Sequence, residues 1–197
     1  MVKWVRQSVN LITFTKEPVR LINTVARVCY MADVPEDNHK QHSFIKKLIE
    51  QDHTSPLEFV DFIWFITTSR SIANELVRHR MASYMQESTR YVKYSMLEMV
   101  DPRDEQIKKL MNENIYSDYE SLIKAGVPKQ YARDVLPLGF VTHIYCKMNL
   151  REFRHFLKLR MSKSAHPLMH ELGHQMLISI KRELPDADYE ALFHGLL

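Results

Sequence analysis

Glycine is scarce in this chain, and the phosphate-binding loops that glycine builds are missing. Only four glycines occur in 197 residues, and neither G-x-G-x-x-G nor G-x-x-x-x-G-K is present. Both loops depend on glycine to bring backbone N–H groups close to phosphate. If the protein binds a dinucleotide cofactor, the cofactor is therefore not held on a Rossmann loop or a P-loop.

Cysteine and long apolar runs are also sparse. Cys29 and Cys146 are the two cysteines, and their wide separation indicates neither a metal motif nor a disulfide framework. No apolar run approaches the roughly 20 residues needed to cross a membrane. The first residues, Met1 to Arg6, lack the apolar core of a signal peptide. We therefore expect a cytoplasmic protein with no membrane partner.

Charge of one sign is not in large excess either. The formal net charge is +3, and 45% of the residues are hydrophobic and 26% charged, which is ordinary for a globular protein. A charge of this size is too small to indicate a nucleic-acid-binding protein, although it suits small anionic ligands. The length predicts one domain, residues 1–197, large enough to bury a core.

The spacing of apolar residues predicts alternating strands and helices. Residues 59–68 are β-branched and aromatic and give the strongest strand prediction. Further extended segments are expected at residues 2–14, 91–100 and 138–148. Helices are expected where apolar residues recur every three to four positions, at residues 18–29, 39–51, 103–125, 127–136, 149–161 and 167–184, and near the C-terminus.

The stretch from Arg78 to Tyr91, RHRMASYMQESTRY, is rich in side chains that can bind an anionic ligand. It holds three arginines, one histidine and two serines, without glycine or proline. Guanidinium groups beside hydroxyls suit a phosphorylated ligand, because the planar fork can meet two phosphate oxygens. A helix capped by Ser69 or Ser71 is expected to reach about residue 81, with Glu75, Arg78 and His79 on the face away from the core and a loop after it. Taken alone, these charges also describe a solvated basic helix end.

A second motif indicates a different chemistry. His170-Glu171-Leu172-Gly173-His174 matches H-E-x-x-H within a predicted helix. Histidines at i and i+4 can share a zinc ion while the glutamate activates water. Leu177 and Ile180 stand where the extended pattern needs glycine and a third histidine, and Glu190 or His194 would have to replace that ligand. A zinc hydrolase is the less favoured alternative.

Four segments together resemble the flavin-dependent thymidylate synthase family. His53-x-Ser55-Pro56-x-Glu58 resembles its H-x-[ST]-P-x-E element. Arg78-His79-Arg80, followed after seven residues by Ser88 and then by Arg90-Tyr91, resembles its signature. Residues 126–137 resemble its G-V-P…A-R…L-P segment, and residues 149–160 its N-x-R…F-L-x-L-R helix. Each segment alone also fits a turn, a surface ion pair or a solvated face, but four in order are far more specific.

The resemblance implies a fold and an activity. The fold would be α/β of the α+β type, with a twisted, largely antiparallel sheet flanked by helices, assembled as a homotetramer with active sites at subunit interfaces. The enzyme would methylate dUMP reductively to dTMP, with methylenetetrahydrofolate as carbon donor and NADPH as reductant. FAD would carry the hydride to C6 of uracil. No metal, nucleic acid or further protein partner is implied.

The resemblance also assigns roles to single positions. The cofactor FAD would be bound by His53, Ser55, Arg78, His79, Arg80, Asn149, Arg151 and His155. The substrate dUMP would be held by Glu75, Gln86, Glu87, Ser88, Thr89, Arg90, Arg133 and Arg160. Ser88 and Arg90 would bind its phosphate. Arg160 would be catalytic, because a fixed cation stabilises the negative charge that develops on uracil as C6 accepts hydride.

The chain departs from the family pattern near the expected nucleotide and folate surfaces. Met85 stands where asparagine is usual, Gln86 where glutamate is more common, and His155 where asparagine can occur. After Arg160, residues 165–168 read A-H-P-L in place of A-Q-W-E. These departures keep two alternatives open: another outcome at C5 of dUMP, such as hydroxymethylation, and nucleotide binding without turnover.

Helical geometry bears on how such a site is assembled. On an ideal helix over residues 149–161, Arg151 and His155 point about 40° apart, while Arg160 points roughly 140–180° from both. One helix cannot easily aim all three side chains at one pocket within a single subunit. We therefore expect a site shared between subunits.

Overall fold

The computed structural model describes residues 2–111 and 114–196 and alternates short strands with helices. The chain divides into two compact units. Unit 1 comprises Met1–Ser8, Ile66–Arg78 and Tyr84–Tyr145, and unit 2 comprises Val9–Phe65, His79–Ser83 and Cys146–Leu197. Four strands, β2, β3, β4 and β6, contribute residues to both units, and the single domain expected over residues 1–197 stays a prediction. No helix within the described ranges is long and apolar enough to cross a membrane.

A four-stranded sheet has the strand order β2-β3-β6-β4. Its strands are β2 (Ser8–Phe14), β3 (Asp61–Ser69), β6 (Val141–Asn149) and β4 (Ala82–Gln86). The N–H of Leu150 donates to the carbonyl of Val60 at 2.7 Å, and that of Arg70 donates to Phe140 at 2.9 Å. The start of β3 therefore meets the end of β6 and the reverse, so these strands are antiparallel. The expected α/β fold with an antiparallel sheet and helices is confirmed.

Burial alternates along β3, as the side-chain period of a strand requires. Phe62, Trp64 and Ile66 are fully buried. In unit 2 the Trp64 ring packs against Phe153 of α7 (Leu150–Arg160) with ring centroids 4.9 Å apart. The indole Nε1 donates to Ser179 at 3.0 Å, so the buried indole N–H is satisfied. These contacts fix the face that α7 turns toward the core.

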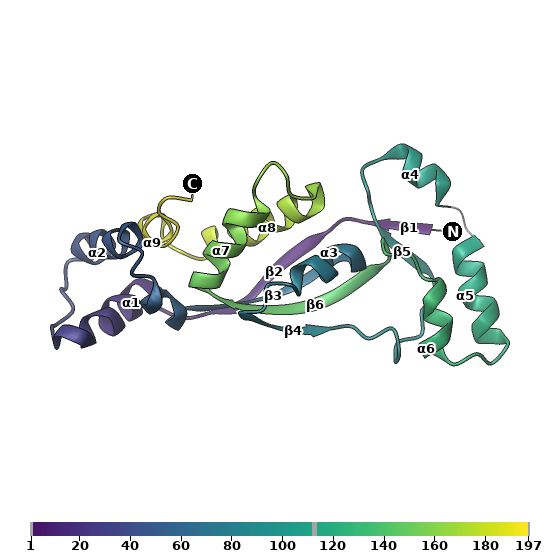
Figure 1. Ribbon diagram of the computed structural model, residues 1–197, viewed down its shortest axis with the longest axis horizontal. Helices are drawn as coiled ribbons and strands as arrows, with labels where there is room; N and C mark the ends of the chain where they lie inside the picture. The colour runs from purple at the N-terminus through teal and green to yellow at the C-terminus, as the bar shows by residue number, and fades with distance from the viewer. Residues whose placement is uncertain (1, 112–113, 197) are drawn as a thin grey trace. The chain divides into compact units, whose positions relative to one another are not determined.

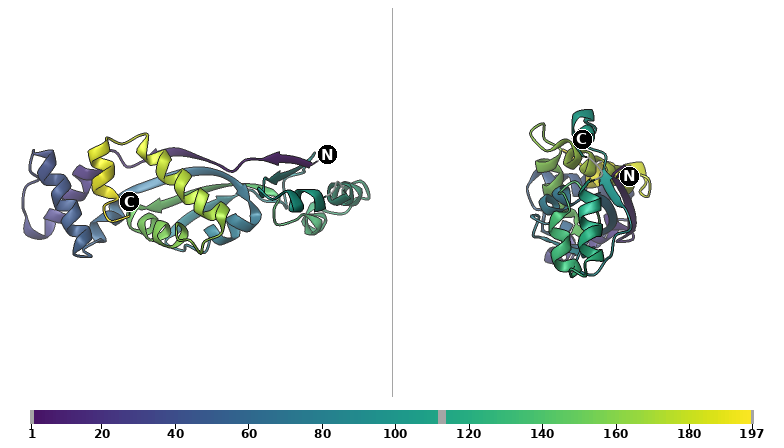
Figure 2. Two further views of the ribbon diagram at one scale, coloured as in Figure 1. Left: turned by 90° about the horizontal axis from the view of Figure 1, so that it is seen from above. Right: turned by 90° about the vertical axis from the view of Figure 1, so that its right-hand side faces the viewer.

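The other helices of unit 2 form two groups. Helices α1 (Pro18–Arg27), α2 (Asn38–Glu50) and α9 (Asp186–Leu192) contact one another and lie together in Figure 1. Helix α8 (Pro167–Lys181), drawn in yellow-green in Figure 2, lies beside α7, drawn in green. Two short 3₁₀ helices, η1 (Val28–Tyr30) and η2 (Ser55–Phe59), complete this unit.

Unit 1 contains a second, two-stranded sheet and several short helices. Strand β1 (Val2–Val5) pairs in parallel with β5 (Leu97–Val100). Leu97, Met99 and Phe140 form a buried apolar cluster beside them. The helical segments are α3 (Arg70–Leu76), α4 (Glu105–Leu110), α5 (Asn114–Lys124), α6 (Lys129–Ala132) and η3 (Arg133–Val135).

The predicted path through residues 71–91 was wrong in two respects. Helix α3 ends at Leu76 rather than near residue 81, and the expected loop contains strand β4. The Tyr84 hydroxyl donates to the carbonyl of Leu76 at 2.8 Å, which satisfies a helix-end carbonyl. His79 therefore does not share a helix face with Glu75, and it is only 6% exposed instead of pointing to solvent.

Other helix boundaries also changed. The single helix expected over 103–125 appears as α4 and α5, and residues 112–113 between them lie outside the described residues. Helix α4 ends where Met111 takes φ −80° and ψ 85°, which is not helical. The α-helix expected over 127–136 covers only α6, and the 3₁₀ helix η3 follows it. Leu150, Phe153, Phe156 and Leu157 are buried, as predicted for α7.

Candidate active site

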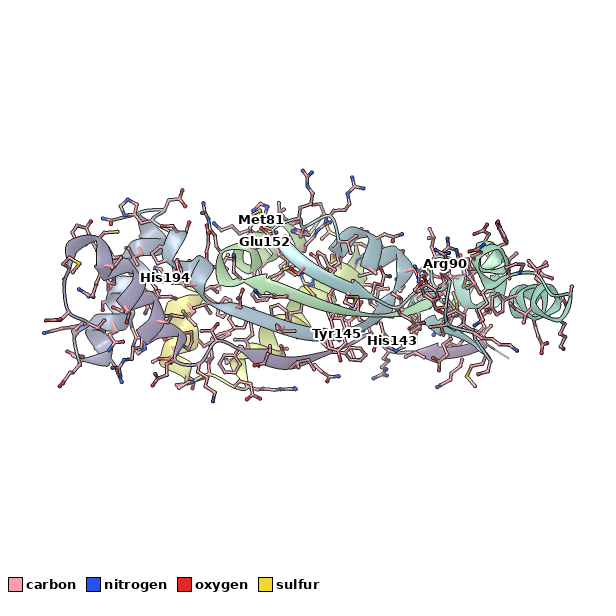
Figure 3. All side chains as sticks on the ribbon, turned by 90° about the horizontal axis from the view of Figure 1, so that it is seen from below. Met81, Arg90, His143, Tyr145, Glu152 and His194 are labelled. Atoms are coloured by element: carbon pink, nitrogen blue, oxygen red, sulfur yellow. The ribbon has the colours of Figure 1, made fainter. Side chains whose placement is uncertain are left out.

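A pocket of about 400 Å³ lies at the start of α7 in unit 2. Figure 3 labels Met81 and Glu152, which both line it. The remaining lining residues are Glu58, Asn149, Arg151 and His155. Asn149, Arg151 and His155 are three of the residues expected to bind the cofactor, so the structure brings them together.

Asn149 ends β6 and caps α7, and it thereby positions the pocket residues of the first turns of the helix. Its side-chain oxygen accepts from the backbone N–H of Glu152 at 2.9 Å, an N-cap that satisfies one of the helix's open donors. Asparagine retains an NH₂ group with two donors. The same residue can therefore cap the helix and still donate toward the pocket.

Arg151 forms an ion pair with Glu58 across the pocket wall. Its guanidinium nitrogen lies 2.5 Å from the Glu58 carboxylate, and the side chains are 54% and 42% exposed. A pair this exposed contributes at most about 1 kcal/mol to stability. Arginine has five N–H donors in a planar fork, so one contact to Glu58 is compatible with binding an anion.

His79 is held between two charged residues of α7. Its Nδ1 lies 3.2 Å from Glu152, and the Nε of Arg160 donates to its Nε2 at 3.0 Å. Because the guanidinium can only donate, Nε2 must be the acceptor and Nδ1 must carry the proton toward the carboxylate. The contact geometry thus selects one neutral tautomer of the imidazole.

Burial also favours the neutral form of His79. Desolvation is the main cause that lowers its pKa below the usual value. The hydrogen bond and charge of Glu152 oppose this shift, whereas the charges of Arg160 and His155 add to it. A neutral imidazole can accept from Arg160, so the lowered pKa and the hydrogen bonds agree.

Helix α7 presents one stripe of side chains to His79. Its ring lies edge-on to Phe156 with centroids 5.0 Å apart, and 6.3 Å from the ring of His155. Residues 152, 156 and 160 recur every four positions and share one helix face. Arg160, expected to point away from Arg151 and His155, therefore reaches the same cluster within one subunit through His79. Arg160 bonds to His79 and is not among the described residues that line the pocket with Arg151 and His155, so the expected site shared between subunits stays a prediction.

The remaining unit 2 candidates, His53, Ser55 and Arg80, are exposed. His53 follows α2 and its backbone N–H donates to the carbonyl of Leu48 at 2.8 Å, while Ser55 begins η2. A second pocket of about 180 Å³ lies beside this segment. Its lining residues are Ile49, Asp52, Thr54, Leu57, Arg151, Arg154, His155 and Lys158.

Arg154 belongs to the basic face of α7 but has a structural role. Its two terminal nitrogens donate to the carbonyls of Leu192 at 2.7 Å and His194 at 2.8 Å. Burial lowers its pKa to about 10, which still leaves it cationic near neutral pH. The side chain therefore ties α7 to the C-terminal segment.

The expected nucleotide residues 86–90 lie in unit 1, where Gln86 ends β4 and residues 87–90 follow it. Gln86 donates to the hydroxyl of Thr142 at 3.2 Å. Ser88 begins a turn in which its hydroxyl accepts from the N–H of Arg90 at 3.3 Å and its carbonyl accepts from Tyr91 at 3.1 Å. The structure thus orders the segment as a turn anchored on β6.

Arg133 reaches the same turn from η3. Its Nη1 donates to the Thr89 hydroxyl at 3.5 Å, so two residues that the sequence predicted for the site meet although they lie 44 positions apart. The guanidinium of Arg90, labelled in Figure 3, lies 5.6 Å from the ring centroid of Tyr91. Glu75 is half-buried on α3, and Arg78 is exposed in the turn after it. The binding roles expected for these residues stay predictions.

Sequence reasoning missed Glu152, which bonds to His79, and also Tyr94 and His143, whose side chains both bond to the carboxylate of Glu87. Glu152 and Arg160 are eight positions apart and therefore lie on the same face of α7. This spacing could have indicated that the two residues contact a common partner. His143 lies on the face of β6 opposite the buried Ile144, as strand alternation would have indicated. Tyr94 carries no such signal, because its contact depends on the path of the turn.

The H-E-x-x-H motif lies on α8 and lacks a third ligand in the structure. No group of three or more His, Cys, Asp or Glu side chains in the described part of the chain could hold a metal ion. Glu171 instead accepts from the side chain of Gln175 at 3.1 Å. The zinc alternative is therefore not favoured.

A turn rich in arginine and hydroxyl groups suits a phosphorylated ligand, because guanidinium groups form strong hydrogen bonds to phosphate oxygens. The model of the family "Thymidylate synthase complementing protein" matches residues 10–186. The flavin-dependent thymidylate synthase of Thermococcus onnurineus is 32% identical, covering 88% of this chain and 78% of the relative. That of Pyrococcus abyssi is 33% identical, covering 89% and 80%. The chain belongs to the flavin-dependent thymidylate synthase family.

Two solved structures share the fold. The UMP/dUMP methylase PolB from Streptomyces cacaoi, bound with 5-Br dUMP, superposes with a TM-score of 0.86 at 21% identity and covers 99% of each chain. Thymidylate Synthase X from Helicobacter pylori, with FAD and dUMP, gives a TM-score of 0.80 at 22% identity, covering 97% of this chain and 99% of the other. The likeness extends over nearly the whole chain.

Proposed function

We propose that this protein is a flavin-dependent thymidylate synthase that methylates dUMP to dTMP. It uses FAD, takes the carbon from methylenetetrahydrofolate and takes reducing equivalents from NADPH. Membership of the family over residues 10–186 supports the activity. The structural observation that carries the proposal is the arrangement of Asn149, Arg151 and His155 around one pocket, with His79 bonded to Glu152 in its wall.

The pocket residues fit a flavin dinucleotide chemically. FAD combines an anionic pyrophosphate with a flat ring that exposes both donors and acceptors. Arg151 and the exposed Arg80 supply cationic donors for the pyrophosphate. Asn149 and His155 can donate or accept beside the ring. His53 and Ser55, at the end of α2 and the start of η2, are further cofactor ligands in this proposal.

The turn after β4 holds the nucleotide. Ser88 and Arg90 bind the phosphate of dUMP, as a hydroxyl and a guanidinium are suited to do. Glu75, Arg78, Gln86, Thr89 and Arg133 contact other parts of the ligands. Arg160 lies beside the uracil ring and stabilises the negative charge that develops there, which is electrostatic catalysis. When bound, FAD supplies the hydride that C6 of the ring accepts.

His79 positions Arg160 for this task. The acceptor at Nε2 orients the guanidinium plane, and Glu152 holds the opposite ring nitrogen. A fixed cation needs no reorganisation as charge develops, which is the source of its catalytic advantage. Glu152 and His79 therefore act on the reaction through Arg160.

Assembly and location complete the proposal. The active enzyme is a cytoplasmic homotetramer with active sites at subunit interfaces. The opposed directions of Arg151 and Arg160 on an ideal helix support a shared site, and Arg160 bonds to His79 rather than lining the pocket that contains Arg151. The family membership supports the same assembly.

The deciding experiment combines a spectrum with a product assay. Purified protein should show flavin absorption that NADPH bleaches without oxygen, and should convert dUMP to dTMP with methylenetetrahydrofolate. Mass spectrometry of the nucleotide separates methylation from hydroxymethylation, the alternative that Met85 and residues 165–168 kept open. Binding of dUMP without product would instead identify a non-catalytic relative, and colourless protein with stoichiometric zinc would refute the flavoenzyme.

A further inference from the structure

Glu87, one of the residues expected to hold dUMP, directly precedes the turn that is proposed to bind the phosphate. A carboxylate beside the phosphate would repel it. In the structure the Glu87 carboxylate is instead engaged by two other side chains. Its Oε1 accepts from the Tyr94 hydroxyl at 2.6 Å, and its Oε2 lies 2.5 Å from Nδ1 of His143. Both oxygens of the acid are thus held by neighbours within unit 1.

The Glu87–Tyr94 hydrogen bond closes the base of the Ser88–Tyr91 turn. Glu87 precedes the turn, and Tyr94 follows it by three residues. The backbone N–H of Glu87 also donates to the carbonyl of His143 at 2.8 Å. Because a carboxylate only accepts, Nδ1 of His143 must carry the proton it shares with Glu87. Three hydrogen bonds therefore fix the position of Glu87 against β6 and Tyr94.

Tyr94 is itself fixed by aromatic packing. Its ring lies 4.6 Å from Phe140 in an edge-to-face arrangement and 6.1 Å from Tyr119. Both partners are 1% exposed, so the hydroxyl projects from a buried aromatic cluster. Burial, with the hydrogen bond and charge of Glu87, raises the pKa of Tyr94 well above its usual value. The hydroxyl therefore stays a proton donor throughout the physiological range.

Figure 3 labels His143, which lies on β6, and Arg90, which lies in the turn that Glu87 precedes. A pocket of about 130 Å³ lies beside the cluster and is lined by Glu87, Tyr94 and His143 among others. The Glu87 side chain is 18% exposed and that of His143 41%. Hydrogen bonds to an ionised acid are stronger than neutral ones, and partial burial strengthens them further.

We propose that Glu87, Tyr94 and His143 form a clasp that holds the Ser88–Tyr91 turn in the shape that binds the nucleotide phosphate. The clasp residues are positioning residues, because their side chains bond to one another rather than to the reacting atoms. Closing the turn before binding reduces the ordering cost that the ligand would otherwise meet. It also turns the negative charge of Glu87 away from the phosphate. This inference rests on the proposed function of the turn.

Replacing Tyr94 with phenylalanine tests the clasp, because it removes only the hydroxyl that donates to Glu87. In flavin-loaded enzyme, Tyr94→Phe should raise the Kd and the KM for dUMP about tenfold, the size expected for one hydrogen bond to a charged group. The kcat at saturating dUMP and the FAD content should stay at the wild-type level. Tyr30→Phe, the same change at an 80% exposed tyrosine, is the matched control and should alter neither constant.

Hydrogen exchange supplies a readout that does not depend on activity. Amides of residues 88–92 should exchange faster in Tyr94→Phe than in wild type, whereas those of α7 should not. Glu87→Gln, which keeps an acceptor for Tyr94, should weaken dUMP binding less than Glu87→Ala. Comparing these two variants tests the clasp even if Tyr94→Phe does not fold.

The outcomes separate the clasp from the proposed function. If wild-type protein binds no dUMP but Tyr94→Phe speeds exchange in the turn, the clasp exists and the proposed function fails. If wild-type protein binds dUMP and Tyr94→Phe binds it equally well with unchanged exchange, the clasp is refuted. A fall in kcat at constant KM would also overturn it, because the defect would then lie outside nucleotide binding.

Discussion

At the scale of a single residue, Arg160 contacts His79 and also carries the charge proposed to stabilise the reacting uracil. Its Nε donates to His79, and its charge is the one that the proposal places beside the uracil ring. Arg160→Ala should lower kcat by about 100-fold or more, the range found when one electrostatic donor is removed from a reaction centre. The FAD content should remain near that of wild type, since other residues hold the cofactor.

Steady-state kinetics and the flavin spectrum of the same preparation check this prediction. Arg182→Ala, which removes an exposed arginine after α8, is the control for a general loss of positive charge. Unchanged turnover in Arg160→Ala would show that another group stabilises the developing charge.

A second prediction at this scale concerns the effect of His79 on how the free energy of unfolding depends on pH. Its folded-state pKa lies below its unfolded value, mainly because burial disfavours the cation. Its contribution to stability is therefore complete above the unfolded pKa of about 6.5 and is lost as pH falls through the folded pKa. Between these pKa values the unfolded chain binds more protons, so the free energy of unfolding should fall with falling pH.

Denaturant unfolding of wild type and His79→Gln between pH 7.5 and 5.5 isolates this contribution. One group changes the slope by at most about 1.4 kcal/mol per pH unit, and His79→Gln should reduce the slope. His39→Gln, at an exposed position of α2, should leave it as in wild type. Equal slopes for wild type and His79→Gln would contradict a lowered pKa at His79.

At the scale of the element, α7 supports the site through its buried face. Leu157 is 3% exposed and Leu159 is 49% exposed on the same helix. Leu157→Ala should lower the free energy of unfolding by about 2–5 kcal/mol, the usual cost of a buried leucine. Leu159→Ala, the identical change at a solvent position, should cost well below about 1 kcal/mol. Thermal or denaturant unfolding would compare the two, and equal losses would show that the buried face does not anchor α7.

The elements that sequence predicted well share a strong internal pattern. Strand β3 alternates buried aromatic residues with partly exposed ones, and α7 repeats apolar residues at helical spacing. The failures arise where tertiary contacts decide. Residues 82–86 read as a loop, but pairing with β6 makes them a strand, and that pairing partner lies nearly 60 residues away.

In the candidate site, too, local sequence patterns could be predicted and tertiary contacts could not. Motif order predicted residues 53–58, 78–90, 126–137 and 149–160 as the segments that carry the site, because the types and spacings of their side chains are unusual together. Motif order could not show that His79 is buried against Glu152, since one residue precedes β4 and the other belongs to α7. Contacts such as Glu87 with Tyr94 depend on a turn whose conformation has no local sequence signal.

At the scale of the whole molecule, the expected ligands of FAD and of dUMP fall largely in different units. Asn149, Arg151 and His155 belong to unit 2, whereas residues 86–90 and Arg133 belong to unit 1. Such a division is compatible with active sites that draw residues from more than one subunit of a homotetramer. Sedimentation velocity should therefore give the mass of four 23.4 kDa chains.

Mixing two inactive variants tests whether subunits share a site. Arg160→Ala and Arg90→Ala should each have strongly reduced activity as homogeneous tetramers, because the first impairs the chemical step and the second impairs phosphate binding. If Arg160 and Arg90 of one active site come from different subunits, co-expressed mixed tetramers contain some sites with both arginines intact. Such mixtures should regain a measurable fraction of wild-type turnover, whereas the separately purified variants combined without subunit exchange should not. A protein that sediments as a monomer yet binds FAD tightly, or mixed tetramers with no recovered turnover, would contradict this arrangement, because each subunit would then contain its complete site.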